Sequence, residues 1–303
     1  MAQTVIITGA TNGLGLATAR LLARAGWSVV ATGRDLSRIT AADRAAGITP
    51  VRLDLGSLAA VRSFADTWDD LGLGAPAAII GNAGGQYTER RWSEDGFELT
   101  VAVNHLAHVA LIDAFLPRLA PGSRVVLIGS GTHDPDEVPF SAPFEDATLE
   151  ELVHPDEPGG TRDGFRRYAT SKLCTVRTLP VLAERLADAG ITVNAFDPGL
   201  MPATGLVRDY TPMQRRLWTL ARPVILLAPR THRVATSAKR LAALVADARY
   251  AGMSGAYVAG RRPIGMSVAA QDLEARRRML DDSVALVGAT NIPMALDPAA
   301  VRA

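Results

Sequence analysis

The stretch TVIITGATNGLG, residues 4–15, decides the fold. It begins as a short apolar, β-branched run, which is typical of a buried strand, and glycines follow at positions 9, 13 and 15. The next residues, ATARLLARAG (17–26), carry apolar side chains at three- and four-residue intervals, which predicts an amphipathic helix. A strand, a glycine-rich turn and a helix in this order indicate the first βα unit of a parallel sheet that binds a nucleotide.

The glycine-rich turn predicts a phosphate-binding site. Glycine permits a tight turn and a close approach of the backbone to a ligand. The N-terminus of the following helix offers free N–H groups and a partial positive charge to a pyrophosphate. The spacing here is Gly-x-x-x-Gly-x-Gly, which differs from the usual Gly-x-Gly-x-x-Gly fingerprint. A plain βα turn is the alternative interpretation, and the strand and the helix on either side favour binding.

Short apolar runs alternate with longer stretches of helical period along the whole chain. This alternation is typical of βαβ units, so we expect an α/β fold: one domain over 1–303 with a doubly wound parallel sheet and helices on both faces. Seven strands are expected in all. After the first, they lie at 27–32, 50–54, 77–82, 124–130, 191–196 and 255–259, and helices are expected at 17–26, 58–72, 101–119, 172–190, 232–248 and 271–288.

Two segments break this alternation. Residues 131–164 are rich in Pro, Asp, Glu and Gly, which predicts a long surface loop. Residues at about 200–230 insert apolar material after the sixth strand, either as a lid over an apolar substrate or as core. The apolar residues of this insertion are Leu200, Met201, Leu206, Met213, Leu217 and Trp218.

Composition excludes several classes of protein. The 303 residues are 48% hydrophobic and 21% charged with a net charge of +1, which is typical of a globular protein and favours no nucleic acid as partner. Cys174 is the single cysteine, so no intramolecular disulfide forms and a reducing cytoplasm fits best. The first residues do not match a signal peptide, and no apolar run predicts a membrane span. We expect a cytoplasmic protein.

Several motifs occur along the chain in a fixed order. They are TGATNGLG (8–15), DL (54–55), NAG (82–84), Asn104 in VNHLAH, Ser130 in VVLIGS, YATSK (168–172) and PG (198–199). With these motifs the chain resembles the short-chain dehydrogenases/reductases over nearly its whole length. This resemblance implies a Rossmann-type domain with a nicotinamide cofactor across the carboxyl ends of the strands. It also implies a catalytic set of Asn104, Ser130, Tyr168 and Lys172.

The resemblance also implies which residues bind the cofactor, with Asp54 at the adenine and the NAG turn beneath the adenosine ribose. A contact of Thr204 with the cofactor stays open, because in PGLMPAT the threonine lies one position further from Pro-Gly than in the commonest pattern of the family. His133 is an open candidate for a residue that lines the pocket. No metal is expected: His105 and His108 lack a carboxylate or third ligand and fit helix packing better. The implied cofactor contacts are Gly9, Thr11, Asn12, Gly13, Leu14, Gly15, Asp54, Leu55, Asn82, Ala83, Gly84, Tyr168, Lys172, Pro198 and Gly199.

The end of the second strand favours NADP(H) over NAD(H). NAD-binding units of this type usually place an acid here to accept from the ribose 2′-hydroxyl. This chain has Gly33 at that position, followed by Arg34, whose guanidinium matches a phosphate bidentately. Arg38, one helical turn on, is a second candidate. Asp35 leaves NAD(H) as the alternative.

Tyr168 and Lys172 lie four residues apart, which places them on one face of a helix about 6 Å apart along its axis. A tyrosine has a pKa of about 10, and a nearby ammonium favours its phenolate, so we expect Lys172 to lower the pKa of Tyr168. Tyr168 can then exchange a proton with a substrate oxygen. By the resemblance, Lys172 also holds the nicotinamide ribose, Ser130 binds the carbonyl oxygen and Asn104 anchors a water. Taken alone, the pair is more typical of a solvated helix face.

Within the family, the chain looks most like the branch of retinol dehydrogenases and light-dependent protochlorophyllide reductases. The first hypothesis is an NADP(H)-dependent oxidoreductase that interconverts a ketone or aldehyde and an alcohol on a hydrophobic small molecule. A C=C reductase of the pigment type is the second, and a non-catalytic NADP-binding sensor or interaction protein is the third. The resemblance further implies a homodimer or homotetramer, formed through the helices around Tyr168.

Overall fold

One sheet organises the fold. The computed structural model describes residues 2–136, 147–155, 161–201, 216 and 231–294, and within them eight strands form a sheet in the order β3-β2-β1-β4-β5-β6-β7-β8. Strands β1 to β7 run parallel, and β8 is antiparallel to β7. The strands are β1 (Thr4–Ile7), β2 (Ser28–Gly33), β3 (Ile48–Arg52), β4 (Pro76–Gly81), β5 (Arg124–Ile128), β6 (Thr192–Asp197), β7 (Tyr257–Ala259) and β8 (Arg262–Pro263).

The predicted α/β fold and its seven parallel strands are confirmed, and the structure adds an eighth strand. Strand β8 pairs its two residues with Val258 and Ala259 after a tight turn that contains Gly260, whose φ is +66°. Two residues carry no alternation of apolar and polar side chains, so sequence periodicity does not reveal such a strand.

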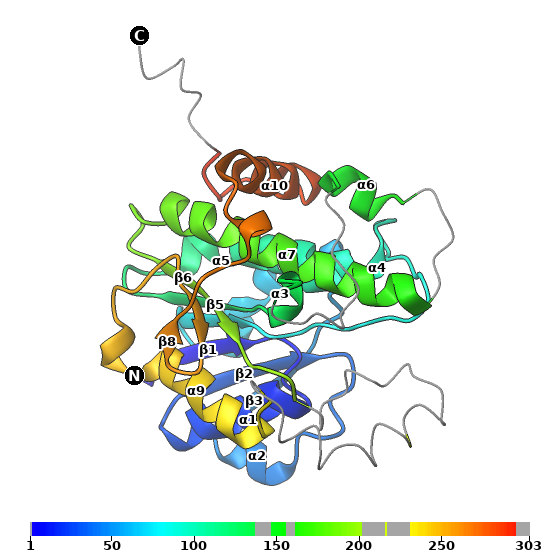
Figure 1. The fold of residues 1–303 in the computed structure, drawn as a ribbon. Helices are drawn as coiled ribbons and strands as arrows, with labels where there is room; N and C mark the ends of the chain where they lie inside the picture. Colours follow the sequence, from blue (N-terminus) through cyan, green and yellow to red (C-terminus); the bar gives the residue numbers. More distant parts are fainter. Residues whose placement is uncertain (1, 137–146, 156–160, 202–215, 217–230, 295–303) are drawn as a thin grey trace.

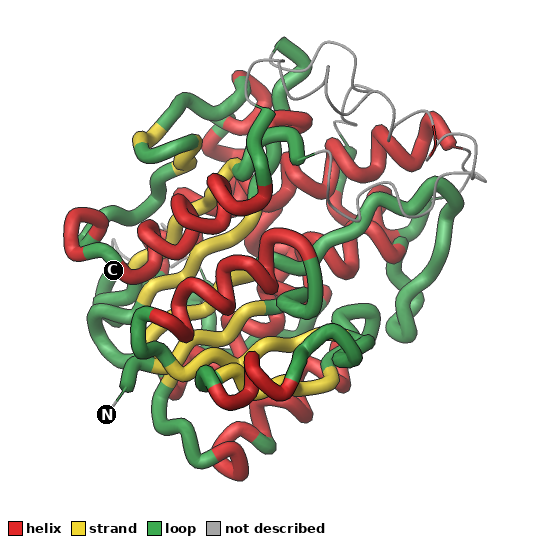
Figure 2. The backbone as a smooth tube through the Cα atoms, turned by 90° about the horizontal axis from the view of Figure 1, so that it is seen from below, coloured by secondary structure: helices red, strands yellow, loops and turns green. Residues whose placement is uncertain are grey.

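Helices cover both faces of the sheet (Figures 1 and 2). Helices α1 and α9 pack together on one face, and α3, α5 and α7 lie on the other, with α10 packed outside α7. The helices are α1 (Gly13–Arg24), α2 (Ala41–Ala45), α3 (Leu58–Asp66), α4 (Leu99–Val101), α5 (Ala107–Phe115), α6 (Leu149–Val153), α7 (Thr161–Arg185), α9 (Val234–Ala246) and α10 (Leu273–Leu286).

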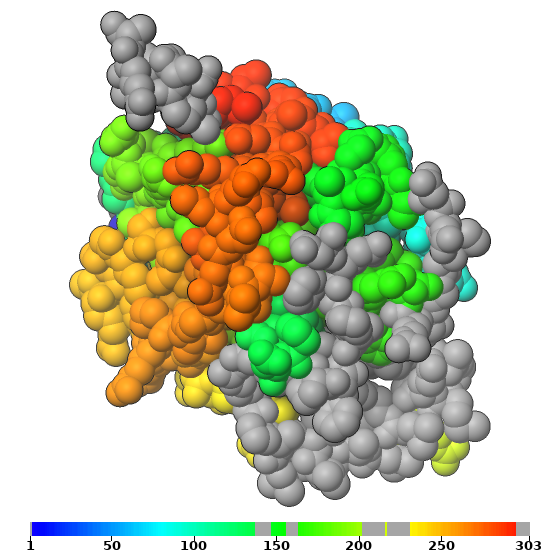
Figure 3. All heavy atoms as spheres, turned by 45° about the horizontal axis from the view of Figure 1, so that its top comes forward, coloured from blue at the N-terminus to red at the C-terminus, as the bar shows by residue number. Residues whose placement is uncertain are grey.

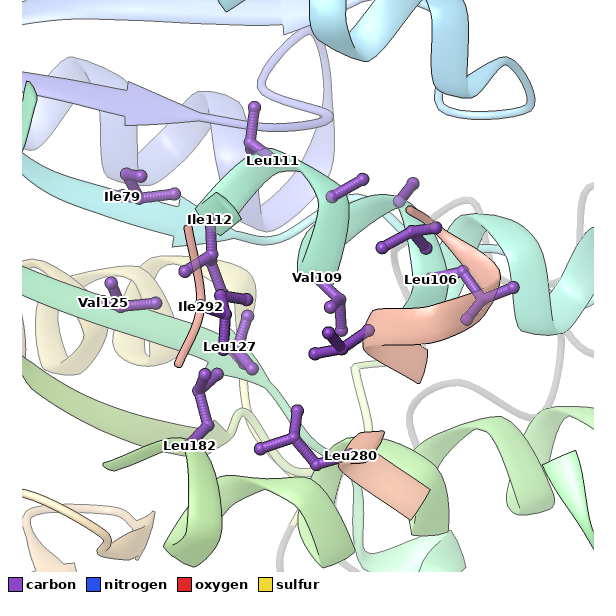
Figure 4. Packing of buried hydrophobic residues seen from close by; sticks show 14 of the residues in the cluster. Ile79, Leu106, Val109, Leu111, Ile112, Val125, Leu127, Leu182, Leu280 and Ile292 are labelled. Carbon is purple, nitrogen blue, oxygen red and sulfur yellow. The ribbon is translucent and has the colours of Figure 1, made fainter. Parts of the chain in front are cut away.

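The larger part of the core lies between the sheet and the layer of α3, α5 and α7. Figure 4 shows side chains of α5, α7 and α10 meeting those of β4 and β5, with Leu111 and Leu182 fully buried among them. Among the described residues, one helical stretch, Leu99–Arg118, is long and apolar enough to cross a membrane, with a mean hydropathy of 1.6. Because 83% of that window is buried inside the protein, it has the character of a core helix.

The strand order creates a topological switch point at the carboxyl ends of β1 and β4. After β1 the chain builds β2 and β3 on one side, then crosses back so that β4 pairs with the other side of β1. Ligands of doubly wound sheets bind outside the carboxyl ends of the strands at such a switch point. The predicted site segments all follow carboxyl ends of strands β1 to β6 or lie on helices that reach this edge.

The two irregular segments are described only in part. Residues 137–146 and 156–160 of the predicted loop at 131–164 lie outside the described residues. Of the predicted lid at about 200–230, only residues 200, 201 and 216 are described, so the lid prediction and Thr204 also lie outside them.

Candidate active site

The glycine-rich turn lies against the end of β4. Gly9 has a φ of +62°, and a Cβ built on it would lie 2.8 Å from the Cα of Ala83. A Cβ on Gly15 would lie 2.5 Å from the Nδ2 of Asn82 and 2.7 Å from the carbonyl oxygen of Gly9. Asn82 Nδ2 itself donates to the carbonyl oxygens of Thr8 (2.8 Å) and Gly9 (3.2 Å). The amide of Asn82 therefore holds the turn, and the turn has no room for a side chain at positions 9 and 15.

The first turn of α1 offers backbone donors at this edge. Gly13 begins the helix with a φ of +53°, and the side chain of Asn12 makes no capping hydrogen bond. The N–H groups of a helix N-terminus have no partner within the helix, and an anion can accept from them. Leu14 and Thr11 are buried, so any contact they make with a ligand is through the backbone or the Thr11 hydroxyl.

The end of β2 has no room for an acid at position 33. A Cβ on Gly33 would lie 2.7 Å from Thr11 Cγ2, so any side chain there would have to displace the side chain of Thr11. Arg34 and Arg38 are exposed. Asp35 is engaged locally, because its Oδ1 accepts from the N–H of Ser37 at 2.9 Å. The side chain of Ser37 and then this backbone hydrogen bond lower the pKa of the carboxyl.

Two further predicted contacts have different surroundings. Asp54 is exposed after β3, and its Oδ1 accepts from the N–H of Gly56 at 2.9 Å, which orients the carboxylate at the binding edge. The side chain of Leu55 is 7% exposed and packs in the core, so it leaves only backbone atoms for a ligand.

Asn104 connects the NAG turn to helix α7. It lies in a π-helical turn, Ala102–Leu106, between α4 and α5, and such turns are frequent at functional sites. Its Oδ1 accepts from the N–H of Gly85 at 2.8 Å, and its Nδ2 donates to the carbonyl oxygen of Gly85 and to Ser171 Oγ, at 3.0 and 2.9 Å. Ser171 Oγ in turn donates to the carbonyl oxygen of Tyr168 at 2.7 Å.

The structure brings Ser130, Tyr168 and Lys172 together. The side chain of Ser130 lies close enough to the phenol of Tyr168 to lower its pKa, and the Nζ of Lys172 lies 5.7 Å from the centroid of the Tyr168 ring. Lys172 is 3% exposed, and its Nζ donates to the carbonyl oxygen of Ile128 at 2.8 Å. A Cβ on Gly84 would lie 3.7 Å from this Nζ, so the NAG turn closes over the same point.

The pKa of Tyr168 differs from the sequence expectation. Burial raises it to about 12, the hydrogen bond from Ser130 opposes this, and the charge of Asp197 adds to it. Burial also lowers the pKa of Lys172 to about 8, against the charge of Asp197. Burial of the phenol is the largest cause of the shift and the Lys172 ammonium does not offset it, so the expected lowering of the Tyr168 pKa is not seen in this structure.

Asp197 is a buried carboxylate at this site that motif reasoning missed. It ends β6, is 5% exposed, and its Oδ1 accepts from the N–H of Gly199 at 2.9 Å. Pro198 and Gly199 lie at the binding edge as expected, with Gly199 at a φ of +72° and the carbonyl oxygen of Pro198 accepting from Ser237 Oγ at 2.7 Å. The sequence FDPG does contain an acid before the turn, which is the signal that motif reasoning passed over.

The remaining candidates are buried. His105 Nε2 lies 2.7 Å from Ser283 Oγ, and His108 Nε2 lies 3.0 Å from Thr8 Oγ1, so both rings make structural hydrogen bonds. Burial lowers their pKa values, to about 3 for His105 and about 4 for His108. Cys174 is 1% exposed, and burial raises the pKa of its thiol to about 12, which makes it a poor nucleophile.

Known proteins share this sequence and fold. A model of the short chain dehydrogenase family matches residues 3–139. Protochlorophyllide reductase A of Oryza sativa subsp. japonica is 33% identical, covering 94% of this chain and 80% of that protein, and the protochlorophyllide reductase of Avena sativa is 32% identical, covering 94% and 99%. The chain belongs to the short-chain dehydrogenase/reductase family. The predicted resemblance, including its protochlorophyllide reductase branch, is confirmed.

Solved structures of the family agree with the fold. A structure from Mycobacterium Paratuberculosis, described as an uncharacterized protein, is 28% identical with a TM-score of 0.72 and covers 96% of this chain and 95% of its own. A blue fluorescent protein from a metagenomic library, solved in complex with NADPH, is 23% identical with a TM-score of 0.61 and covers 86% and 97%. This short-chain dehydrogenase therefore has the single Rossmann-type domain that the sequence predicts.

Proposed function

We propose that this short-chain dehydrogenase is an NADP(H)-dependent oxidoreductase that interconverts a ketone or aldehyde and an alcohol on a hydrophobic small molecule. The observation that carries the proposal is the placement of the Ser130 side chain against the phenol of Tyr168, beside the buried ammonium of Lys172. Two neighbouring hydroxyl donors supply what a carbonyl oxygen needs as negative charge develops on it.

The binding edge fits a dinucleotide. At Gly9, Gly15 and Gly33 a Cβ would overlap neighbouring protein atoms, so only the backbone lies at this edge, and the N-terminus of α1 carries no side-chain cap. In the proposal, the turn at residues 9–15 holds the pyrophosphate, Asp54 and the NAG turn hold the adenosine, and Tyr168, Lys172, Pro198 and Gly199 hold the nicotinamide end. When bound, the cofactor supplies or accepts a hydride.

The choice of NADP(H) depends on the end of β2. Two exposed guanidiniums, Arg34 and Arg38, lie beside a glycine that has no room for an acid, and a guanidinium pairs strongly with a phosphate. Asp35, the acid that leaves NAD(H) open, already accepts from the N–H of Ser37. NADP-bound structures among the neighbours, such as the one solved with NADPH, are consistent with this choice.

Tyr168 is the proposed proton donor for reduction and proton acceptor for oxidation. With a pKa of about 12, its hydroxyl is protonated at neutral pH, so it has a proton to give to the substrate oxygen. Lys172 carries a positive charge at pH 7, since its pKa is about 8, and this charge favours the phenolate that remains. Asn104 holds the NAG turn and the backbone of Tyr168 in place through Gly85 and Ser171.

Exposed apolar side chains on α7 and after the PG turn support a hydrophobic substrate. Phe165, one helical turn before Tyr168 on α7, is 37% exposed, and Leu200, after the PG turn, is 39% exposed. Large apolar side chains that stay accessible beside a polar site are typical of pockets for apolar ligands. The direction of the reaction would follow the ratio of oxidised to reduced cofactor.

Reduction of a C=C bond in a conjugated pigment is the second candidate. It is favoured by the relatives at 33% and 32% identity, whose names are protochlorophyllide reductase. Tyr168 can deliver a proton to carbon as well as to oxygen, so the described residues serve either reaction.

Consumption of NADPH separates these candidates. We expect turnover with lipophilic ketones or aldehydes in darkness, and Ser130→Ala and Tyr168→Phe should abolish it. Turnover restricted to a conjugated porphyrin-type pigment under light would replace the carbonyl assignment with the second candidate. If Ser130→Ala and Tyr168→Phe leave every biological effect unchanged while Arg34→Ala removes it, the protein is a sensor.

Cell location and assembly are parts of the proposal. A buried, unpaired Cys174 suits a reducing cytoplasm, which is where we place the protein. Pairing through the helices around Tyr168 has to leave room for α10, which already packs along α7 and is joined to it by the ion pair of Arg185 and Asp281. Sedimentation velocity distinguishes a single chain from a dimer or tetramer.

A further inference from the structure

A buried histidine links the proposed catalytic serine to a segment far away in the chain. His133 lies in a short helical turn, Gly131–His133, that begins directly after Ser130, and its side chain is 1% exposed. Its Nδ1 lies 2.7 Å from the carbonyl oxygen of Ser130, and its Nε2 lies 3.3 Å from the backbone nitrogen of Ser267. Figure 3 shows the orange segment between β7 and α10, to which Ser267 belongs, at the molecular surface.

These two contacts fix the tautomer of the ring. A carbonyl oxygen only accepts and a backbone N–H only donates, so Nδ1 carries the proton and Nε2 accepts from Ser267. Burial lowers the pKa of His133, against the hydrogen bond to Ser130 and the charges of Asp134 and Asp197, which keeps the ring neutral at pH 7. The neutral ring can make both hydrogen bonds together, whereas a protonated ring would face the Ser267 N–H with a second donor.

Aromatic packing holds the ring in this orientation. His133 meets the ring of Tyr257 on β7 edge to face, with centroids 5.0 Å apart and an interplanar angle of 84°. Tyr257 is 1% exposed, and a Cβ on Gly129 would lie 2.7 Å from its Cε2. The residue before Ser130 therefore lies directly on the tyrosine that supports His133.

We propose that His133 is a positioning residue that sets the backbone of Ser130 from the segment after β8. Ser130 Oγ already accepts from the N–H and the hydroxyl of Thr132, at 3.3 and 3.0 Å, so its direction depends on the conformation of this short turn. His133 closes the same turn from the other side, through the carbonyl oxygen of Ser130. Without it, the hydroxyl of Ser130 loses its alignment with that of Tyr168. This inference rests on the proposed role of Ser130.

Two variants of His133 and one control variant test the proposal by their kcat and KM. His133→Phe keeps the ring against Tyr257 and removes both hydrogen bonds, and we expect kcat to fall about 10- to 100-fold with the KM for NADPH within about twofold, because a small displacement of a reacting group costs about this much. His133→Asn can restore the donor to the carbonyl oxygen of Ser130 and should recover most of kcat. The exposed His154→Phe is the control and should match the wild type.

A second pair of variants leaves His133 intact. Ser267 has a φ of −55°, which proline adopts, so Ser267→Pro removes the N–H that His133 accepts from, while Ser267→Ala keeps it. We expect the proline variant to lose kcat and the alanine variant to keep it. This pair decides the question if His133→Phe does not fold, as judged by circular dichroism and NADPH binding.

Either of two results would overturn the proposal. The first is a wild-type kcat in His133→Phe. The second is an equal loss of kcat in His133→Asn and His133→Phe, together with equal activities of Ser267→Pro and Ser267→Ala. Ser130→Ala separates this failure from failure of the proposed function. If Ser130→Ala is active, both the proposed function and the inference about His133 are wrong. If Ser130→Ala is inactive and His133→Phe is as active as the wild type, only the inference about His133 is wrong.

Discussion

At the carboxyl ends of β1, β2 and β4, the site is formed largely by residues without side chains: a Cβ at Gly9, Gly15 or Gly33 would lie within 2.8 Å of another atom. At the ends of β5 and β6 and on α7, the site consists of buried polar side chains that are bound to backbone groups, such as Lys172 on Ile128 and His133 on Ser130. The first region is shaped to receive the flat and charged parts of a dinucleotide. The second holds reactive groups at fixed positions, which requires partners distant in the chain.

The two regions are joined by α5 and the π-helical turn before it. His108 lies near Thr8 Oγ1 on one side and the carbonyl oxygen of Asn104 on the other, at 3.0 and 3.3 Å. Asn104 continues the connection to Ser171 on α7. Substitutions in the first region should therefore act mainly on cofactor affinity and stability, and those in the second mainly on turnover.

The largest expected effect comes from removing the buried ammonium. Lys172→Met keeps the length of the side chain and should lower kcat/KM about 1000-fold, because the positive charge beside Tyr168 and the proposed contact to the nicotinamide ribose are both lost. Steady-state kinetics with NADPH measures this. Lys239→Met, on the exposed face of α9, is the control, and similar losses in both variants would contradict a specific role for Lys172.

A side chain added to the glycine-rich turn should distort the backbone of the first region. Gly15→Ala places a Cβ 2.7 Å from the carbonyl oxygen of Gly9, so we expect the free energy of unfolding to fall by about 1–3 kcal/mol, together with weaker NADPH binding. Alanine normally stabilises a helix relative to glycine, which makes the sign of the change informative. Gly265→Ala, where no atom lies within 4 Å of the added Cβ, should be neutral in chemical denaturation.

Replacement of Arg34 tests the preference of the first region for NADPH over NADH. Arg34→Ala should raise the Kd of NADPH about tenfold and leave the Kd of NADH unchanged, because a charge-assisted hydrogen bond to the 2′-phosphate contributes about 1.5–3 kcal/mol. Fluorescence titration of both cofactors measures this. Equal affinities of the wild-type protein for the two cofactors would contradict the role of Arg34.

The buried histidines of the π-helical turn and of α5, His105 and His108, should change the stability only in acid. The pKa values of His105 and His108 are about 3 and 4 in the folded protein, below their ordinary value, so the unfolded chain binds more protons below pH 6.5. The free energy of unfolding should therefore fall as the pH falls from about 6.5 toward 4, by up to about 1.4 kcal/mol per pH unit for each histidine. His105→Gln should make the dependence shallower in denaturant titrations at several pH values, and an unchanged slope would show that His105 does not contribute.

Local features of the fold were predictable from the sequence. The run Val5–Ile7 is fully buried in a parallel sheet, and such strands read as continuous apolar runs whatever their partners. The glycine-rich turn was equally clear, because backbone conformation at Gly9 and Gly13 restricts the residue type directly. Strand β8 and the π-helical turn at Asn104 were missed, since neither leaves a periodic pattern.

The surroundings of the reactive groups were not predictable in the same way. The spacing of Tyr168 and Lys172 places them on one helix face, but the pKa of Tyr168 depends on burial by segments distant in the chain and on Asp197 of β6. His133 was only an open candidate, because its contact with Ser267 spans 134 positions of the sequence. Resemblance to a family identified the motif residues, and only the packed structure shows which other residues hold them.

Cofactor binding and turnover, measured together on Tyr168→Phe, test most directly the claim that Tyr168 transfers the proton to and from the substrate. The change removes one hydroxyl from the second region and leaves the glycine-rich region untouched. We predict an NADPH Kd within about threefold of the wild type, and a loss of turnover on lipophilic carbonyl substrates of about 100-fold or more. A Tyr168→Phe enzyme that binds NADPH and still turns over at the wild-type rate would contradict the account.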